Sequence, residues 1–337
     1  MTLLTRRRLV LVKEESVYGT DPTPIPQLNA LLVRSIEVTP LNATMVQREN
    51  IQPYLGNYES LVALKNVELT LEVELAGSGN TAVAPAFAPL LKACGLSENY
   101  YAAGGAVLSD VADVDAITNT WDVPYNPGNY PARFEYTPRS ENFSSATVYI
   151  NVDGIRHQVT GCRGTVDLNF ESGAIPTLSF QLIGSYQAPQ DSALQEPVYY
   201  QPTPFPANSV SSAFSLYSFA AKLRSFTFNL GSEAVWRELI GEAYTMLVNR
   251  NSSASAVIEA ERLNTKDFFA ATLASSYGNL VLTHGNTAGN TVILRSDRVD
   301  LTAGPTYSDD GGVTMLNLPL SFIPSVAGND ELKLIFQ

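Results

Sequence analysis

Histidine and cysteine are scarce in this chain, which has two of each among its 337 residues. Cys94 and Cys162 define no disulfide framework and have no metal-ligand spacing, which favours a reducing compartment. His157 and His284 have no second ligand-type residue at helical spacing, and we interpret both as surface histidines. The scarcity therefore predicts no metal site and no cofactor.

Catalytic signatures are also missing. The chain has no Gly-x-Ser-x-Gly elbow and no phosphate-binding glycine loop before a helix. Residues 161–164, Gly-Cys-Arg-Gly, lie between strand patterns and predict a β-bulge or a tight turn. Carboxylates are plentiful, but nothing in their pattern supports paired-carboxylate hydrolysis. We predict no catalytic residues and a protein that is not an enzyme.

Positive charge and long apolar runs are in short supply. The chain has 21 Lys and Arg against 33 Asp and Glu, a net charge of −12. It lacks the excess of basic residues that is typical of a protein that binds phosphates, although a negative net charge can also simply keep a protein soluble. Arg6–Arg8 is the only basic cluster, and a structural arm, a clamp on an acidic neighbour or a DNA contact would each explain it. The apolar run at 9–12 is too short for a signal peptide or a membrane helix, so we expect cytoplasmic synthesis and no membrane partner.

The chain contains an internal sequence repeat. Short segments match at a near-constant offset of 189 or 190 residues, a hallmark of internal duplication. The matches are 31–38 with 221–228, Arg48-Glu49 with Arg237-Glu238, and 68–72 with 257–261. Duplication suits a pseudo-symmetric assembly better than an enzyme with one active site.

The domain division follows from length, the repeat and proline. A chain of this length predicts about two domains. Residues 187–209 contain five prolines and predict a stiff, extended linker. We therefore predict an N-terminal arm at 1–30, a first domain at 31–186 with an insertion at 97–145, the linker, and a second domain at 210–337.

Most of the chain has strand patterns. Residues 67–75 alternate apolar and polar side chains and predict a half-buried strand with an acidic outer face. Asp153-Gly154 predicts a two-residue hairpin turn. Short helices are predicted at 86–95, with Gly95 as the stop, and at 265–274, with Thr265 as the N-cap. Further strands are predicted at 147–152, 155–159, 165–170, 177–184, 291–294, 298–302 and 313–318.

Each copy also has a long connection after its first strand, at 39–64 and at 229–253. Such long segments without clear structure are uncommon in compact domains and often serve binding. Within the second connection, residues 233–243 suggest a short helix. We assign both connections as candidate binding segments.

Two segments resemble a known family. Residues 13–24, Lys-Glu-Glu-Ser-Val-Tyr-Gly-Thr-Asp-Pro-Thr-Pro, are similar to the opening of tail tube proteins of long-tailed siphophages. Residues 164–180 are similar to the same family, and the second half of the chain shows the likeness only through the repeat. The resemblance implies a mainly β fold with two tandem β-sandwich or tube domains, each with a short flanking helix.

The resemblance also implies an assembly. Tube domains join their sheets into a continuous β-barrel ring, and a duplicated chain would form a trimer with six pseudo-equivalent domains. Stacked rings would conduct genomic DNA and hold the tape measure protein in the lumen, with tail terminator and baseplate proteins at the ends. The location would be the tail of the virion, after assembly in the host cytoplasm.

Candidate site residues follow from this picture. An acidic lining would let DNA slide without sticking, because each cationic phosphate contact adds affinity through counterion release. The lumen-facing candidates are Glu68, Glu72, Asp167, Glu259 and Asp300, and a merely solvated outer face is the alternative. The ring-stacking candidates are Arg48, Tyr54, Tyr58, Trp236 and Arg237.

Other functions stay open at this stage. A secreted or virion-surface β-sandwich adhesin or carbohydrate-binding module would need export, and no signal for it is visible. No set of catalytic residues in the sequence supports a β-rich hydrolase. Another tail component, such as a tail terminator or a sheath-like protein, is a closer alternative.

Overall fold

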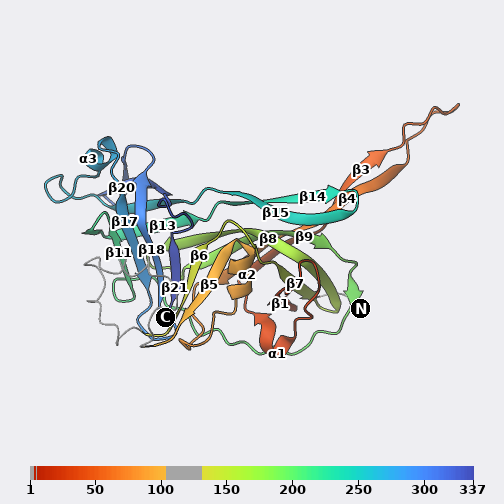
Figure 1. Ribbon diagram of the computed structural model, residues 1–337, viewed down its shortest axis with the longest axis horizontal. Coiled ribbons are helices and arrows are strands. Elements are labelled where there is room, and N and C mark those ends of the chain that lie inside the picture. Colours follow the sequence, from red (N-terminus) through yellow and green to blue (C-terminus); the bar gives the residue numbers. More distant parts are fainter. Residues whose placement is uncertain (1–3, 5, 104–130) are drawn as a thin grey trace.

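The computed structural model describes residue 4 and residues 6–103 and 131–337. The fold is mainly β, a curled antiparallel sheet with three short helices among the described residues. The molecule is elongated, with the C-terminal half at one end and a projecting hairpin at the other (Figure 1). The predicted β class is therefore confirmed.

The N-terminal half forms a sheet in the spatial order β2-β1-β7-β8-β9-β4-β3, antiparallel throughout. Strand β8 is long and bends, so that its first part pairs with β7 and its last part pairs with β9. The elements are β1 (Arg8–Glu14), α1 (Pro26–Asn29), β2 (Ala30–Leu31), β3 (Ser35–Gln47), β4 (Ser60–Glu74), α2 (Ala88–Ala93), β5 (Leu96–Tyr101), β6 (Arg133–Pro138), β7 (Ala146–Val152), β8 (Ile155–Glu171) and β9 (Thr177–Tyr186).

The C-terminal half repeats this order as β12-β11-β17-β18-β20-β16-β13. Its elements are β10 (Gln190–Asp191), β11 (Ser212–Leu216), β12 (Phe219–Ala220), β13 (Leu223–Asn229), β14 (Ser232–Leu239), β15 (Glu242–Arg250), β16 (Ser253–Glu259), α3 (Phe268–Leu273), β17 (Gly278–His284), β18 (Val292–Leu301), β19 (Thr306–Asp310), β20 (Val313–Phe322) and β21 (Lys333–Phe336). The repeat seen in the sequence is therefore also a repeat of strand connectivity.

Strand β13 joins the two halves by pairing with the end of β8. Phe226 lies opposite Phe170 and Phe228 opposite Leu168, and all four side chains are buried. They belong to one apolar cluster that extends through both halves. Burial of large apolar side chains is the main stabilising term of such a core, so the junction is part of the fold's interior.

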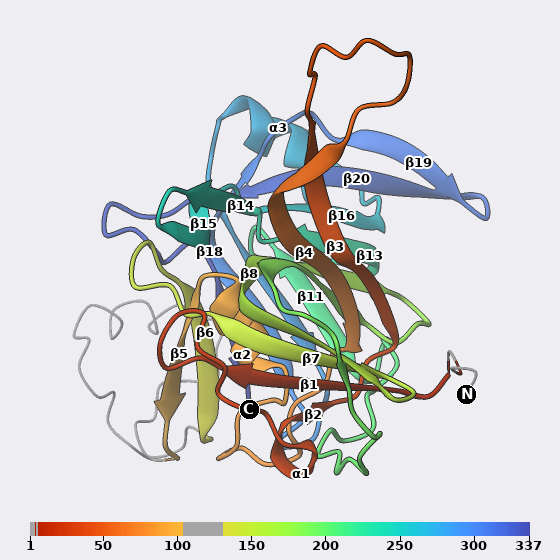
Figure 2. The same ribbon diagram turned by 90° about the vertical axis from the view of Figure 1, so that its right-hand side faces the viewer.

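The predicted arm and the predicted insertion take part in the same structure. Residues 8–14, which the sequence analysis assigned to an arm, form the buried strand β1 beside β7 (Figure 2). Within the predicted insertion, β5 and β6 pair with each other, and β6 also pairs with β21 from the end of the chain. Residues 104–130 of the insertion lie outside the described residues.

The two long connections are extended hairpins, and the helix expected at 233–243 is wrong. Strands β3 and β4 continue into one hairpin, and β14 and β15 form the other. In residues 233–237 the exposure alternates along the chain, with Glu233 exposed and Ala234 half-buried, which is a strand pattern. Gly241, at φ 106°, closes the second hairpin tightly, as only glycine does without strain.

Several local predictions are confirmed, and two are wrong. Asp153 and Gly154 make the hairpin turn with positive φ, and the register shifts between Thr160 and Arg163, where the bulge was expected. The cap of α3 is Asp267, whose carboxylate accepts from the Ala270 N–H, and not Thr265. His284 is buried, because its ring nitrogens bond to Ser212 and to the Phe205 carbonyl, and so it is not a surface residue.

The strand register corrects one part of the repeat alignment. Ser35 lies opposite Glu72, and Ser225, its counterpart, lies opposite Val257. Glu72 therefore corresponds to Val257 and not to Glu261. The shift arises because the β14–β15 turn is shorter than the β3–β4 tip, which shortens the second copy between its paired strands.

Candidate functional site

A polar row crosses the sheet at right angles to its strands. Residues that lie directly opposite each other in antiparallel strands point to the same face. Following the partners from one strand to the next gives a row on one face through both halves. Its members are Ser35, Glu72, Ser179, Asp167, Asn229, Ser253, Ser321 and Asp300.

The five predicted lumen residues share this face. Glu72, Asp167 and Asp300 are in the row, while Glu68 and Glu259 lie an even number of positions along β4 and β16 and so point the same way. The opposite face is apolar and buried; it includes Leu69, Leu71, Leu168, Phe180 and Leu318. The structure therefore gathers all five carboxylates on the exposed side of one sheet.

Each carboxylate has a different environment. Glu68 accepts from the Asn42 amide at 2.9 Å, and Glu259 forms an ion pair with Lys222 at 2.9 Å. Asp167 accepts from the Gln181 amide at 2.9 Å through one oxygen, while its other oxygen has no partner among the described residues. Burial raises the pKa of Asp167, and the Gln181 hydrogen bond opposes that shift.

A groove of about 640 Å³ lies on the same face, where the start of β14 crosses the N-terminal half. Carboxylates and amides line it, including Glu37, Glu68, Gln181 and Glu233. No group of side chains suited to a metal ion is found in the described parts of the chain. The buried thiols are poor nucleophiles, because burial raises the pKa of Cys94 and of Cys162.

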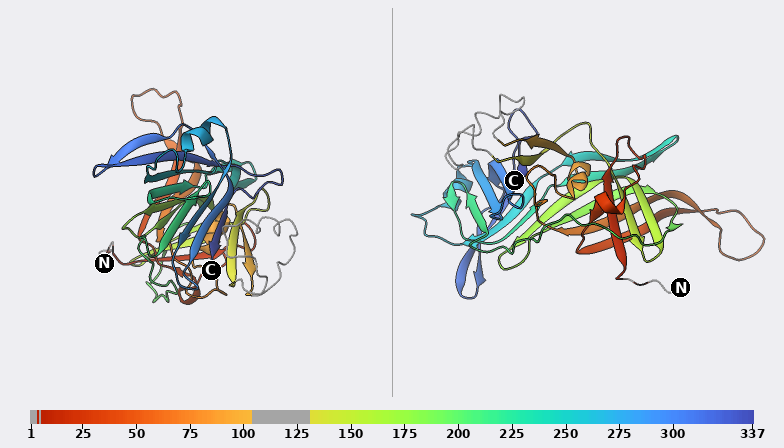
Figure 3. Two further views of the ribbon diagram at one scale, coloured as in Figure 1. Left: turned by 90° about the vertical axis from the view of Figure 1, so that its left-hand side faces the viewer. Right: turned by 90° about the horizontal axis from the view of Figure 1, so that it is seen from below.

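The ring-stacking candidates lie on the two hairpins. Arg48, Tyr54 and Tyr58 are exposed at the tip of the β3–β4 hairpin, where Arg48 pairs with Glu59 at 2.9 Å. Trp236 and Arg237 are on β14, which lies along the N-terminal half. The hairpins meet at one point, where the Glu238 carboxylate accepts from the Lys65 N–H at 3.4 Å. Beyond it they point in different directions in the view from below (Figure 3).

The exposed polar sheet face and the projecting hairpin are the two main surface features of the described structure. A family model described as phage tail tube protein matches residues 5–324, nearly the whole chain. The chain belongs to this family. No curated protein sequence matches it. It is therefore a structural tail tube protein of a bacteriophage virion, a family whose members assemble into a tube with other tail components.

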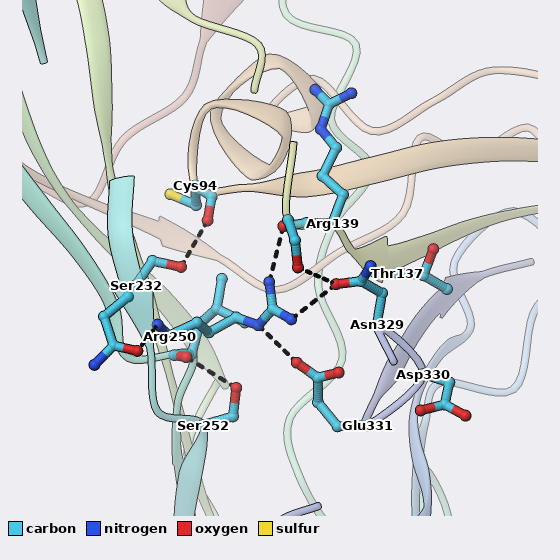
Figure 4. A network of polar contacts seen from close by, with 12 residues as sticks. Cys94, Thr137, Arg139, Ser232, Arg250, Ser252, Asn329, Asp330 and Glu331 are labelled. Carbon is cyan, nitrogen blue, oxygen red and sulfur yellow. Dashed lines mark hydrogen bonds and ion pairs between the residues drawn. The ribbon is translucent and has the colours of Figure 1, made fainter. Parts of the chain in front are cut away.

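In this tail tube protein, a buried polar network holds the β14–β15 hairpin (Figure 4). Arg250, at the base of β15, donates to the Glu331 carboxylate at 2.6 Å and to the Arg139 carbonyl at 2.9 Å. Ser232, at the base of β14, donates to the Cys94 carbonyl at 2.9 Å. The network ties the β14–β15 hairpin to both halves.

Further along the same hairpin, Thr245 anchors β15 to the N-terminal half. Its N–H donates to the Tyr18 hydroxyl, and its own hydroxyl donates to the Ile183 carbonyl at 3.1 Å. Arg163 donates to the Thr245 carbonyl at 2.9 Å and lies over the Tyr18 ring.

Sequence reasoning missed these anchoring residues. Arg250 and Glu331 are 81 positions apart, and Thr245 and Tyr18 are 227 apart, so no local pattern connects them. The match of Arg237 with Arg48 and the two long connections indicated that the second hairpin had a counterpart. In the described part of the chain no helix is long and apolar enough to cross a membrane.

Proposed function

We propose that three copies of this chain close into a ring and that the rings stack into the tail tube that conducts DNA. The observation that carries this proposal is the internal junction between β8 and β13, which joins two repeats of one strand order into a single sheet. Each chain supplies two tube domains, so three chains supply six pseudo-equivalent repeats. The symmetry of the ring is then three-fold, because the repeats differ.

The polar face of the sheet lines the lumen in this proposal. A ring closes with one face inward, and the apolar face is already buried under the core and the helices. Glu68, Glu72, Asp167, Glu259 and Asp300 would then face the DNA. Between them lie mainly Ser, Thr, Asn and Gln side chains, which offer DNA little electrostatic attraction.

The tip of the β3–β4 hairpin makes the contact between rings. It projects from the body and carries exposed apolar side chains, including the fully exposed Ile51 and Leu55 (Figure 1). Exposed apolar patches of this kind mark interaction sites. Arg48, Tyr54 and Tyr58 belong to this tip, while Trp236 and Arg237 on β14 would border the contact.

Other tail components complete the proposal. The tape measure protein and genomic DNA would occupy the lumen, and terminator and baseplate proteins would cap the ends. Assembly would take place in the host cytoplasm.

Negative-stain microscopy of the purified chain, with native mass measurement, tests the proposal. We expect stacked rings or tubes whose unit has the mass of three chains. A protein that remains monomeric at high concentration, without rings, would contradict it.

A further inference from the structure

Several strand edges have no partner strand within the described structure, and two of them belong to β3 and β19. Strand β3 pairs only with β4, and β19 pairs only with β20, in the parts of the chain that are described. Every residue of β19 is exposed. Exposed strand edges favour pairing with another chain, so proteins usually shorten, charge or cover them. These two edges therefore need an explanation.

The register shows that β19 occupies the place that the end of β8 occupies in the first repeat. In the first repeat, Ser35 lies opposite Glu72, Glu72 lies opposite Ser179, and Ser179 lies opposite Asp167. In the second repeat the same steps lead from Ser225 through Val257 and Asn317 to Thr306. Thr306 is therefore the counterpart of Asp167.

The outer edge of β8 at Asp167 is covered by β13, with Asn229 opposite Asp167. The corresponding edge of β19 has no partner strand among the described residues. The strand that matches β13 is β3, whose outer edge is likewise unpaired in the described part of the chain.

We infer that β3 of one copy pairs antiparallel with β19 of the next copy, in the register that β13 has with β8. This inference rests on the proposed function and specifies its ring contact. In the internal junction, Asn229 lies opposite Asp167 and Ser225 lies opposite Glu171. The same register between copies places Thr39 opposite Thr306 and Ser35 opposite Asp310 of the next copy. The contact is a continuation of the sheet from one copy to the next.

Apolar side chains support this register. Phe226 and Phe228 of β13 are 0% and 7% exposed, because β8 and the core cover them. Their counterparts Ile36 and Val38 on β3 are only half-buried. Tyr307 of β19 is 63% exposed and lies opposite the buried Leu316. In the inferred register Val38 lies opposite Tyr307, and pairing would remove both from water.

Charge supports it independently. Arg224, next to Ser225, contacts Glu171 across the internal junction at 3.3 Å and Asp310 of its own half at 2.8 Å. Arg34 precedes Ser35 in the same Arg-Ser pair, its side chain is 56% exposed, and Glu72 is 4.0 Å away. In the inferred register Arg34 reaches the β19–β20 turn of the next copy. Asp309 and Asp310 there would then serve both arginines.

Engineered disulfides test the register directly. Residues opposite each other in antiparallel strands have Cα atoms about 4.5–5.5 Å apart, a separation that suits a disulfide. We expect the full-length double variant Thr39→Cys/Thr306→Cys to form covalent trimers under mild oxidation, seen on a non-reducing gel and lost on reduction. Cys94 and Cys162 are buried and do not interfere.

The matched control is Thr39→Cys/Tyr307→Cys, whose thiols point to opposite faces of the sheet and should not cross-link. Rings or tubes that form without cross-links in the Thr39/Thr306 variant, or that cross-link equally in the control, would overturn the inferred register and leave the tube function standing. A wild-type chain that forms no ring at all would overturn both.

A second variant tests the charge contact without cysteine chemistry. Arg34→Glu places a carboxylate opposite the neighbour's turn, so ring assembly should fall at least tenfold while circular dichroism stays unchanged. The control is Arg262→Glu, an exposed arginine outside both edges. Assembly of Arg34→Glu at the wild-type level would contradict the inferred contact.

Discussion

The two hairpins of this tail tube protein have the same design and different surroundings. Both carry a register shift, between Thr44 and Met45 in one and between Glu233 and Ala234 in the other. The pair after the shift is Met45 with Val62 and Ala234 with Leu247. Yet Val62 is 55% exposed, and Leu247 is 6% exposed.

The difference comes from the partner that each hairpin meets. The β14–β15 hairpin lies on the N-terminal half of its own chain, where the Leu247 side chain lies beside Gly95. The β3–β4 hairpin instead projects beyond both halves (Figure 1), and Val62 stays exposed.

Removing the β3–β4 tip should have the largest effect. Joining Gln47 to Ser60 through an Asn-Gly turn removes residues 48–59, and with them the proposed ring-stacking surface. We expect a folded protein, with an unchanged melting temperature, that forms no tubes under the electron microscope. Normal tubes from this variant would refute the stacking role.

Arg250→Ala should unfold the docked hairpin. It leaves the Glu331 carboxylate, whose side chain is 5% exposed, without its ion-pair partner. Breaking one side of a buried pair costs about 3–5 kcal/mol. Urea unfolding measures the loss. Lys65→Ala, at the matching place on β4, is the control and should change the unfolding free energy by less than about 0.5 kcal/mol.

Leu247→Ala and Val62→Ala compare how tightly the two hairpins are packed. Truncating the buried leucine should lower the unfolding free energy by about 2–5 kcal/mol, because it opens a cavity. Truncating the exposed valine should cost below about 0.5 kcal/mol in the monomer. Similar losses in chemical denaturation would show that the two hairpins are equally packed.

Gly231→Ala tests the bend that directs β14 onto the N-terminal half. Gly231 has φ 66°, and an added Cβ would lie 2.1 Å from the Asn251 carbonyl oxygen. We expect a loss of about 1–3 kcal/mol. Calorimetry checks it, with Gly56→Ala as the control, since a Cβ there meets nothing within 4 Å.

The smallest effect should come from a change of pH. Burial lowers the pKa of His284, so the folded state resists protonation while the unfolded chain takes up a proton near pH 6.5. Stability from neutral His284 is complete above that pH and is lost as the pH falls below it. The free energy of unfolding should drop less between pH 7 and 5.5 in His284→Gln than in the wild type, by about 1 kcal/mol or below.

The local fold was largely predictable from the sequence, and the site was predictable in part. Alternation in residues 67–75 predicted β4 and its acidic outer face, and the Asp153-Gly154 turn predicted the hairpin of β7 and β8. The hairpin strand at 233–239 was not predictable, because a two-stranded ribbon has no continuous core face to impose a clear pattern. The buried position of His284 depends on a linker carbonyl far away in the chain.

The sequence by itself determined the β class, the duplication and the resemblance to tail tube proteins, because periodicity, turn residues and repeated segments are local properties. The tertiary structure alone decided that five distant carboxylates share one face and that β13 closes onto β8. It also decided that one hairpin is docked while its counterpart projects. These features depend on strand register and on contacts between residues far apart in the chain, and no local pattern encodes them.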